Sequence, residues 1–216
     1  CLDRDAGRRV FYFLAGYGLR FNEGLSRMVA YLLARQRLSD IIITADDSGF
    51  VLSLPQSARV NIPGVISSIR AENCEQLLYR AVQNSGLLKS VFRINATCSF
   101  MILKSYKGRQ KSARHQQLDA DMLIGFAGRL DDFAVLRESF REIIEDRFEI
   151  ENIRAVLRCL ASGEIEVVVK RGKPPGPMAF GLAAASAGWE KRERMKEMQS
   201  AIVRAKGDKK DSAKSI

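Results

Sequence analysis

The sequence contains a long stretch in which every charged side chain is basic. Between Glu75 and Asp119 there is no aspartate or glutamate, and aromatic residues are interleaved with the bases. Lysine and arginine neutralise phosphates and release condensed counterions, while aromatic rings stack on nucleic-acid bases. This pattern therefore favours the binding of a nucleic-acid strand. The bases are Arg80, Lys89, Arg93, Lys104, Lys107, Arg109, Lys111 and Arg114, and the interleaved aromatic residues are Phe92, Phe100 and Tyr106.

Helical geometry predicts how part of this stretch is displayed. A helix over residues 87–106, at about 100° per residue, aligns four bases and one ring on one side: Lys89, Arg93, Lys104, Lys107 and Phe100. The side expected to face the core holds Leu87, Val91, Ile94, Cys98 and Met101. Gly108 is expected to interrupt this helix. The alternative is a merely solvated basic face, with the Phe100 ring packed against a neighbour. The candidate nucleic-acid-binding residues are Lys89, Arg93, Phe100, Lys104, Tyr106, Lys107, Arg109, Lys111 and Arg114.

Catalytic and metal chemistry have few other candidates. The single histidine, His115, excludes sites built from several imidazoles, and the four cysteines form no Cys-x-x-Cys pair, so we expect reduced thiols. Gly16 and Gly18 lack the third glycine of a dinucleotide-binding fingerprint, and the Gly-x-x-x-x-Gly-Lys-Ser/Thr loop is absent. We therefore expect no metal, cofactor or ATP site in this chain. Asp46 and Asp47 could bind a metal, but beside a Ser-Gly pair they favour a turn.

Composition narrows the class of protein. The chain has 216 residues, with 35 Lys and Arg against 25 Asp and Glu, and a formal net charge of +10. Polyanions are the expected partners: nucleic acid first, an anionic membrane surface second. No apolar run is long enough to span a bilayer and no signal-peptide pattern opens the chain, so we expect a cytoplasmic protein without a membrane partner. Because the chain begins with Cys1 rather than Met, we expect it to be a piece of a longer polypeptide.

Periodicity predicts an α+β fold. We expect a small antiparallel or mixed sheet, packed on one face by a helix over residues 19–36, together with a larger helical lobe. Asp131 with Asp132, and Asn152, are expected to cap the last two helices of this lobe, and Gly163 to end the second of them. The predicted strands are 9–14, 41–45, 50–54 and 164–170, and the other predicted helices include 64–69, 72–84, 87–106 and 109–130.

The expected organisation is one domain with an appendage. Residues 1–185 are expected to form the domain, with a sheet part made of 1–62 and 163–172 and a helical lobe made of 63–162. Residues 186–216 are rich in charge, and we expect a helical or disordered C-terminal tail there.

Several short motifs, taken in order, resemble one family. They are Arg-Phe-Asn-Glu-Gly-Leu-Ser-Arg at 20–27, Asp-Asp-Ser-Gly-Phe at 46–50, Phe-Arg at 92–93, Ser-Phe-Met-Ile-Leu at 99–103, Tyr-Lys-Gly at 106–108 and Pro-Met-Ala-Phe-Gly at 177–181. Together they resemble the large helicase-related (Lhr) family of ATP-dependent helicases, in its archaeal type. The resemblance covers about residues 8–185. It is to the DEAD/H-associated domain that follows the motor and winged-helix modules.

The resemblance implies a setting that the residues alone do not show. In that family the region is a mixed sheet-and-helix domain that completes the channel for the tracking single strand, beside two RecA-like motor domains. It implies an accessory nucleic-acid-binding domain of a 3′-to-5′ DNA or RNA helicase that acts in unwinding or repair. ATP and Mg would then be bound by motor domains upstream, and the partners would be single-stranded or duplex nucleic acid and those RecA-like and winged-helix domains.

Two other functions remain open from the sequence. One is a free-standing RNA- or DNA-binding protein. The other is a protein-interaction module whose apolar helix, over residues 19–33, docks a partner. Salt separates them, because binding to phosphates weakens steeply with salt while apolar docking does not.

Overall fold

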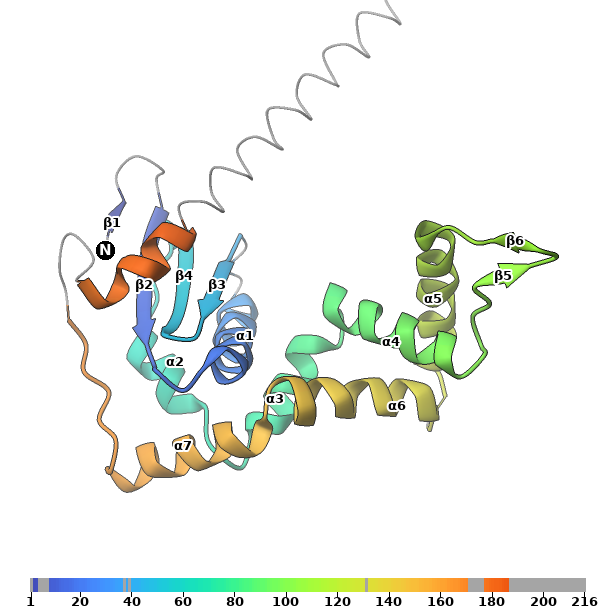
Figure 1. The fold of residues 1–216 in the computed structure, drawn as a ribbon. Helices are drawn as coiled ribbons and strands as arrows, with labels where there is room; N and C mark the ends of the chain where they lie inside the picture. Colours follow the sequence, from blue (N-terminus) through green and yellow to red (C-terminus); the bar gives the residue numbers. More distant parts are fainter. Residues whose placement is uncertain are drawn as a thin grey trace, which may run out of the picture.

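A four-stranded antiparallel sheet forms one end of the molecule (Figure 1). The structure is a computed structural model that describes residues 2–3, 8–36, 38, 40–130, 132–170 and 177–186. The strands are β1 (Leu2–Asp3), β2 (Arg8–Leu14), β3 (Ile42–Asp46) and β4 (Gly49–Pro55), in the order β1-β2-β4-β3. The predicted strands 9–14, 41–45 and 50–54 are therefore confirmed, as is the α+β fold.

Alternation along the strands gives the sheet two apolar faces. Phe13 and Phe50 stack with ring centroids 4.2 Å apart and belong to the main core, which helix α1 (Leu19–Arg35) covers. Successive strand residues point to opposite faces, so Val10 and Val51 lie on the other face, where Leu182 packs on them. Leu182 belongs to a helix over residues 180–186 that continues from a 3₁₀ turn, Pro177–Ala179.

Helix α1 is covered by its own domain. The apolar side chains of α1 are buried in the main core: Phe21, Met28, Val29 and Leu33. The predicted alternative, in which this helix docks a separate partner, is therefore wrong, because the sheet already covers the apolar face.

The turn between β3 and β4 shows why its residue types are required. The Asp46 carboxylate accepts hydrogen bonds from the backbone N–H groups of Ser48 (2.8 Å) and Gly49 (3.1 Å). A Cβ on Gly49 would lie 1.9 Å from the carbonyl oxygen of Phe13 on β2, so only glycine fits there. The predicted turn is confirmed, and the Asp46 carboxylate accepts hydrogen bonds from its backbone.

The helices divide between two hydrophobic cores. Helices α2 (Ile62–Ser68), α3 (Cys74–Val82) and α7 (Ile150–Ser162) share the main core with the sheet and α1. A smaller core, centred on Phe92, belongs to α4 (Gly86–Cys98), α5 (Ala113–Ala127) and α6 (Ala134–Arg141). A π-helix, η1 (Glu142–Arg147), joins α6 to α7, and these elements run along one side of the molecule between its two ends (Figure 1).

The predicted strand over 164–170 is wrong. These residues have no regular structure and pair with no strand in the described chain, and the side chains of Val167, Val168 and Val169 are exposed. Gly163 does end α7, in the left-handed conformation (φ 82°), as predicted. β1 pairs only with Arg8 and Arg9 of β2, so the outer edge of β2 beyond them has no partner strand in the described chain, and residues 164–170 do not pair with it. Strand propensity without backbone pairing forms no strand.

The predicted helix boundaries need correction in the helical part. The helix predicted over 87–106 ends at Cys98, and the one predicted over 109–130 begins at Ala113. Phe133 occupies the N-cap position of α6, and Glu149 occupies that of α7. The caps predicted at Asp132 and Asn152 are therefore wrong. Asp131 and residues 187–216 of the predicted tail lie outside the described residues. The division of residues 1–185 into a sheet part and a helical lobe stays a prediction.

Candidate nucleic-acid interface

The predicted basic stripe is not one face of one helix. Lys89 and Arg93 lie on α4, whereas Lys104 and Lys107 lie beyond its end, in a separate hairpin. The predicted inward face is right only for Leu87 and Val91, which pack against the main core. The fully buried residues of α4 are Leu88, Phe92 and Ala96, which pack into the two cores, whereas Ile94 and Cys98 are exposed.

The C-terminus of α4 holds Phe100 in an unusual conformation. The N–H of Phe100 bonds to the Thr97 carbonyl (3.2 Å), and that of Met101 bonds to the Ala96 carbonyl (2.8 Å). This is the Schellman pattern, whose left-handed position is usually glycine. Phe100 occupies it with φ 59°, although a left-handed conformation costs an L-residue roughly 1–2 kcal/mol. Its side chain is 85% exposed, so no burial offsets this strain.

A short hairpin follows and carries most of the candidate bases. Strands β5 (Ser105–Tyr106) and β6 (Arg109–Gln110) are antiparallel, and Lys111 N–H bonds to the Lys104 carbonyl (2.8 Å) just beyond them. Lys107 (φ 48°) and Gly108 (φ 76°) form the two-residue turn, whose paired positive φ values match the type I′ geometry. The hairpin projects from the helices at the end of the molecule opposite the sheet (Figure 1). Gly108 therefore makes a turn instead of only interrupting a helix.

Helix α5 begins immediately after the hairpin and presents Arg114 in its first turn. Ser112 caps the helix, because its Oγ accepts a hydrogen bond from the backbone N–H of His115 (3.3 Å). The same Oγ lies 2.8 Å from His115 Nδ1. Ser112 thus positions the start of the helix, a role the sequence reasoning missed although serine before a helix is a cap signal. His115 is part of this cap.

Two of the candidate bases are neutralised by acids of α5. Lys111 Nζ lies 2.8 Å from Asp119, and Lys89 Nζ lies 3.4 Å from Asp121. Lys104, Arg109 and Arg114 are exposed and form no ion pair with any residue that the structure describes. We call Lys104, Lys107, Arg109 and Arg114 the hairpin cluster; all four are exposed. Three residues of the hairpin cluster lie in or beside the hairpin and Arg114 lies in the first turn of α5, whereas Lys89 and Arg93 lie on α4. Tyr106 lies in strand β5.

The motif over residues 20–27 has a structural role. The amide of Asn22, which is fully buried, donates to the carbonyls of Asp46 (2.8 Å) and Asp47 (3.3 Å) and ties α1 to the β3–β4 turn. A Cβ on Gly24 would lie 2.7 Å from Ile153 Cδ1, so glycine lets α1 approach α7 closely. These residues hold α1 against the β3–β4 turn and against α7.

The charged residues of the same motif hold the junction between η1 and α7. Arg20 pairs with Glu149 (2.9 Å), and Arg147 pairs with Glu23 (3.3 Å). The Arg27 guanidinium lies 5.6 Å from the centre of the Phe148 ring. Burial lowers the pKa of Arg27, although nearby Glu23 opposes the shift. This region therefore supports the fold.

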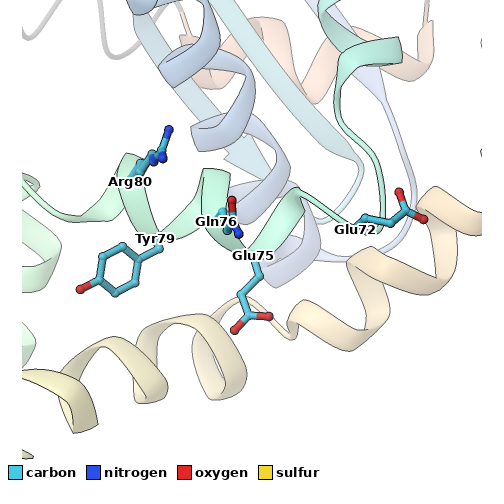
Figure 2. Close-up of a pocket in the computed structure, with 5 residues that line it drawn as sticks. All are labelled: Glu72, Glu75, Gln76, Tyr79 and Arg80. Atoms are coloured by element: carbon cyan, nitrogen blue, oxygen red, sulfur yellow. The ribbon is translucent and has the colours of Figure 1, made fainter.

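The surface hollow on α3 does not form a convergent binding site. It is lined by Glu72, Glu75, Gln76, Tyr79 and Arg80, and Figure 2 shows that their side chains point in different directions. Tyr79 stacks on Phe140 with ring centroids 4.0 Å apart. Within the described residues there is also no group of three or more His, Cys, Asp or Glu side chains that could hold a metal ion. No helix in this part of the chain is long and apolar enough to cross a membrane.

The fold and the surface together define an α+β domain whose helical end carries an exposed basic hairpin. The chain belongs to the DEAD/H associated family, whose model matches residues 1–179. Its sequence is similar to ATP-dependent helicase Lhr-Core protein 2 of Thermococcus barophilus, with 33% identity over 207 residues that make up 93% of this chain and 24% of the relative. It is also similar to ATP-dependent helicase Lhr-Core of Methanothermobacter thermautotrophicus, with 35% identity over 82% of this chain and 20% of the relative.

A solved structure has the same fold. The helicase Lhr of Mycobacterium smegmatis, bound to ssDNA and AMP-PNP, matches with a TM-score of 0.72 and 24% identity, over 82% of this chain and 22% of that one. The resemblance to the Lhr family expected from the motifs is confirmed. The chain spans about a quarter or less of the length of these relatives.

Proposed function

We propose that this chain is the nucleic-acid-binding accessory domain of an ATP-dependent helicase, and that the hairpin cluster and Phe100 contact a single strand. The observation that carries the proposal is the projecting hairpin with its exposed cations, of which Lys104, Arg109 and Arg114 have no acidic partner among the described residues. A cation that is not already paired can neutralise a phosphate without first breaking an ion pair, so these three side chains suit a polyanion better than Lys89 and Lys111 do.

The conformation of Phe100 supports the same proposal. Backbone strain without a packing benefit is a feature of positions kept for function. Here it holds an aromatic ring in solvent, a few residues before the hairpin cluster, where a base could stack on it. Phosphate contacts from the hairpin and stacking on one ring are the two components of single-strand binding without sequence preference.

The rest of the activity is assigned to other parts of a longer polypeptide. ATP and Mg would be bound by RecA-like motor domains, which with a winged-helix domain are the proposed partners of this chain. Unwinding of DNA or RNA in the 3′-to-5′ direction, a role in repair and a cytoplasmic location follow from the same proposal. The relatives named as ATP-dependent helicases support it.

A charge-matched pair of variants tests the proposal. In the first, the four residues of the hairpin cluster are changed to Gln. In the second, four exposed arginines of the other end of the molecule, Arg35, Arg59, Arg70 and Arg158, are changed to Gln. Affinity for a single-stranded oligonucleotide is measured by fluorescence anisotropy at several salt concentrations.

The two variants have the same net charge, so they separate a site from general attraction. The cluster variant should lose most binding, and its salt slope should fall by about three units, from roughly 0.7 per phosphate contact on single strands. The control should change little. Equal losses in both variants would mean that net charge alone drives binding, and the proposed interface would have to be abandoned.

A further inference from the structure

Helix α5 exposes a line of large apolar side chains. We call Leu118, Met122, Phe126 and Leu130 the α5 stripe; each follows the last by four residues, so they lie along one side of the helix and its end. Met122 is 72% exposed and Phe126 is 59% exposed, and Leu118 and Leu130 are also exposed.

The inward side of α5 makes this exposure unusual. The buried residues of the helix are two alanines, Ala120 and Ala127, while Leu123 and Ile124 are only partly buried against the small core. A surface helix ordinarily turns its largest apolar residues inward. Exposed apolar patches on soluble domains mark interaction surfaces. Helix α5 therefore has apolar side chains on two sides, and only one of these sides packs against the part of the chain that the structure describes.

The charges around the α5 stripe indicate which chemical groups a complementary surface would carry. The two acids of the helix, Asp119 and Asp121, are held by Lys111 and Lys89, so no acid of α5 is free. Arg129 lies beside the end of the stripe and is exposed. The complementary surface is apolar with acidic groups at its rim.

We propose that the α5 stripe docks against another domain of the same polypeptide. The chain matches only 24% of the Thermococcus barophilus relative and 22% of the solved Mycobacterium smegmatis chain, so in such proteins most of the polypeptide lies outside this domain and is available to cover it. Nucleic acid fits the stripe less well, because three of its four side chains are aliphatic and offer no ring for stacking. The inference rests on the proposed function, in which this chain is one domain of a longer helicase, and it adds the surface by which the chain contacts the rest of that polypeptide.

Oxidation of methionine reports directly on whether the stripe is covered. The test compares residues 1–216 with the polypeptide encoded by the whole reading frame that contains them, both without nucleic acid. Each is treated with dilute hydrogen peroxide, and methionine sulfoxide is measured by mass spectrometry. In residues 1–216, Met122 and Met178 (79% exposed) should react quickly and the buried Met28 slowly. In the longer polypeptide, oxidation of Met122 should be at least tenfold slower.

Two variants provide the control. Phe126→Glu should restore rapid oxidation of Met122 in the longer polypeptide, whereas Phe180→Glu, which changes an exposed aromatic residue beside the sheet, should not. The proposal is overturned if the frame encodes no further domain or if Met122 reacts equally fast in both proteins. Protection only after adding an oligonucleotide would identify nucleic acid as the occupant, and protection of residues 1–216 at high concentration would identify a second copy; either result also overturns it. Oligonucleotide binding is measured separately, so failure here leaves the strand-binding proposal intact.

Discussion

Replacing Phe100 by glycine is expected to stabilise the fold and weaken nucleic-acid binding at once. Glycine relieves the left-handed strain of roughly 1–2 kcal/mol, while its greater freedom in the unfolded chain costs about 0.5–1 kcal/mol. Because the ring is 85% exposed, almost no buried apolar area is lost. The net gain is about 0–1.5 kcal/mol, which for a chain of this size raises Tm by up to about 6 °C.

The same substitution removes the ring on which a base is proposed to stack. Loss of one such contact costs about 1–3 kcal/mol, or roughly five- to 150-fold in Kd. Phe100→Ala should weaken binding equally but keep its Cβ in the left-handed conformation, so its Tm should stay near that of the parent.

Thermal unfolding and oligonucleotide titration of both variants give the answer, with Phe180→Ala as an exposed aromatic control that should change neither quantity. A Gly variant with lower Tm would refute the strain assigned to Phe100. Unchanged affinity in both variants would refute its contact with a base.

Three further outcomes are expected. Gly49→Ala should lower the stability to urea by about 3 kcal/mol or more, because the new methyl group meets a backbone oxygen of β2 that cannot move aside; a neutral result would contradict the close approach of the strands. Asn22→Ala should lower the free energy of unfolding by about 1–3 kcal/mol by leaving the carbonyls of the β3–β4 turn without donors, and an unchanged denaturation midpoint would show that the turn is held otherwise. Residues 1–216 alone should hydrolyse no ATP with or without nucleic acid, since the sequence has no phosphate-binding Gly-Lys-Ser/Thr loop; hydrolysis by a clean preparation would disprove this.

Local patterns predicted the sheet and α1 well, because strand alternation and helical periodicity are properties of neighbouring residues. The strand over 164–170 failed for the opposite reason. Strand propensity there is strong, but a strand also needs an edge to pair with, and whether the segment reaches one depends on where α7 ends and on the course of the chain after it. Such long-range placement cannot be read from the segment itself.

The candidate site was predicted in composition but not in geometry. Helical spacing predicts helix over residues 99–106 and 109–112, where the structure has none, because Lys107-Gly108 forms a hairpin turn and the left-handed Phe100 ends α4 without the usual glycine signal. The absence of acids between residues 76 and 118 indicates where bases gather without acidic neighbours in the sequence. It could not show that Asp119 and Asp121, just outside that interval, fold back to pair with Lys111 and Lys89.

Photochemical crosslinking tests the central claim most directly. A single-stranded oligonucleotide carrying 5-iodouracil, which crosslinks efficiently to an aromatic ring stacked on it, is irradiated with residues 1–216, and the crosslinked peptides are identified by mass spectrometry. The expected result is a crosslink at Phe100, with any others in residues 104–114, that disappears in the Phe100→Gly variant. Crosslinks confined to the sheet end of the molecule, or spread evenly over the surface, would contradict the interface proposed for this domain.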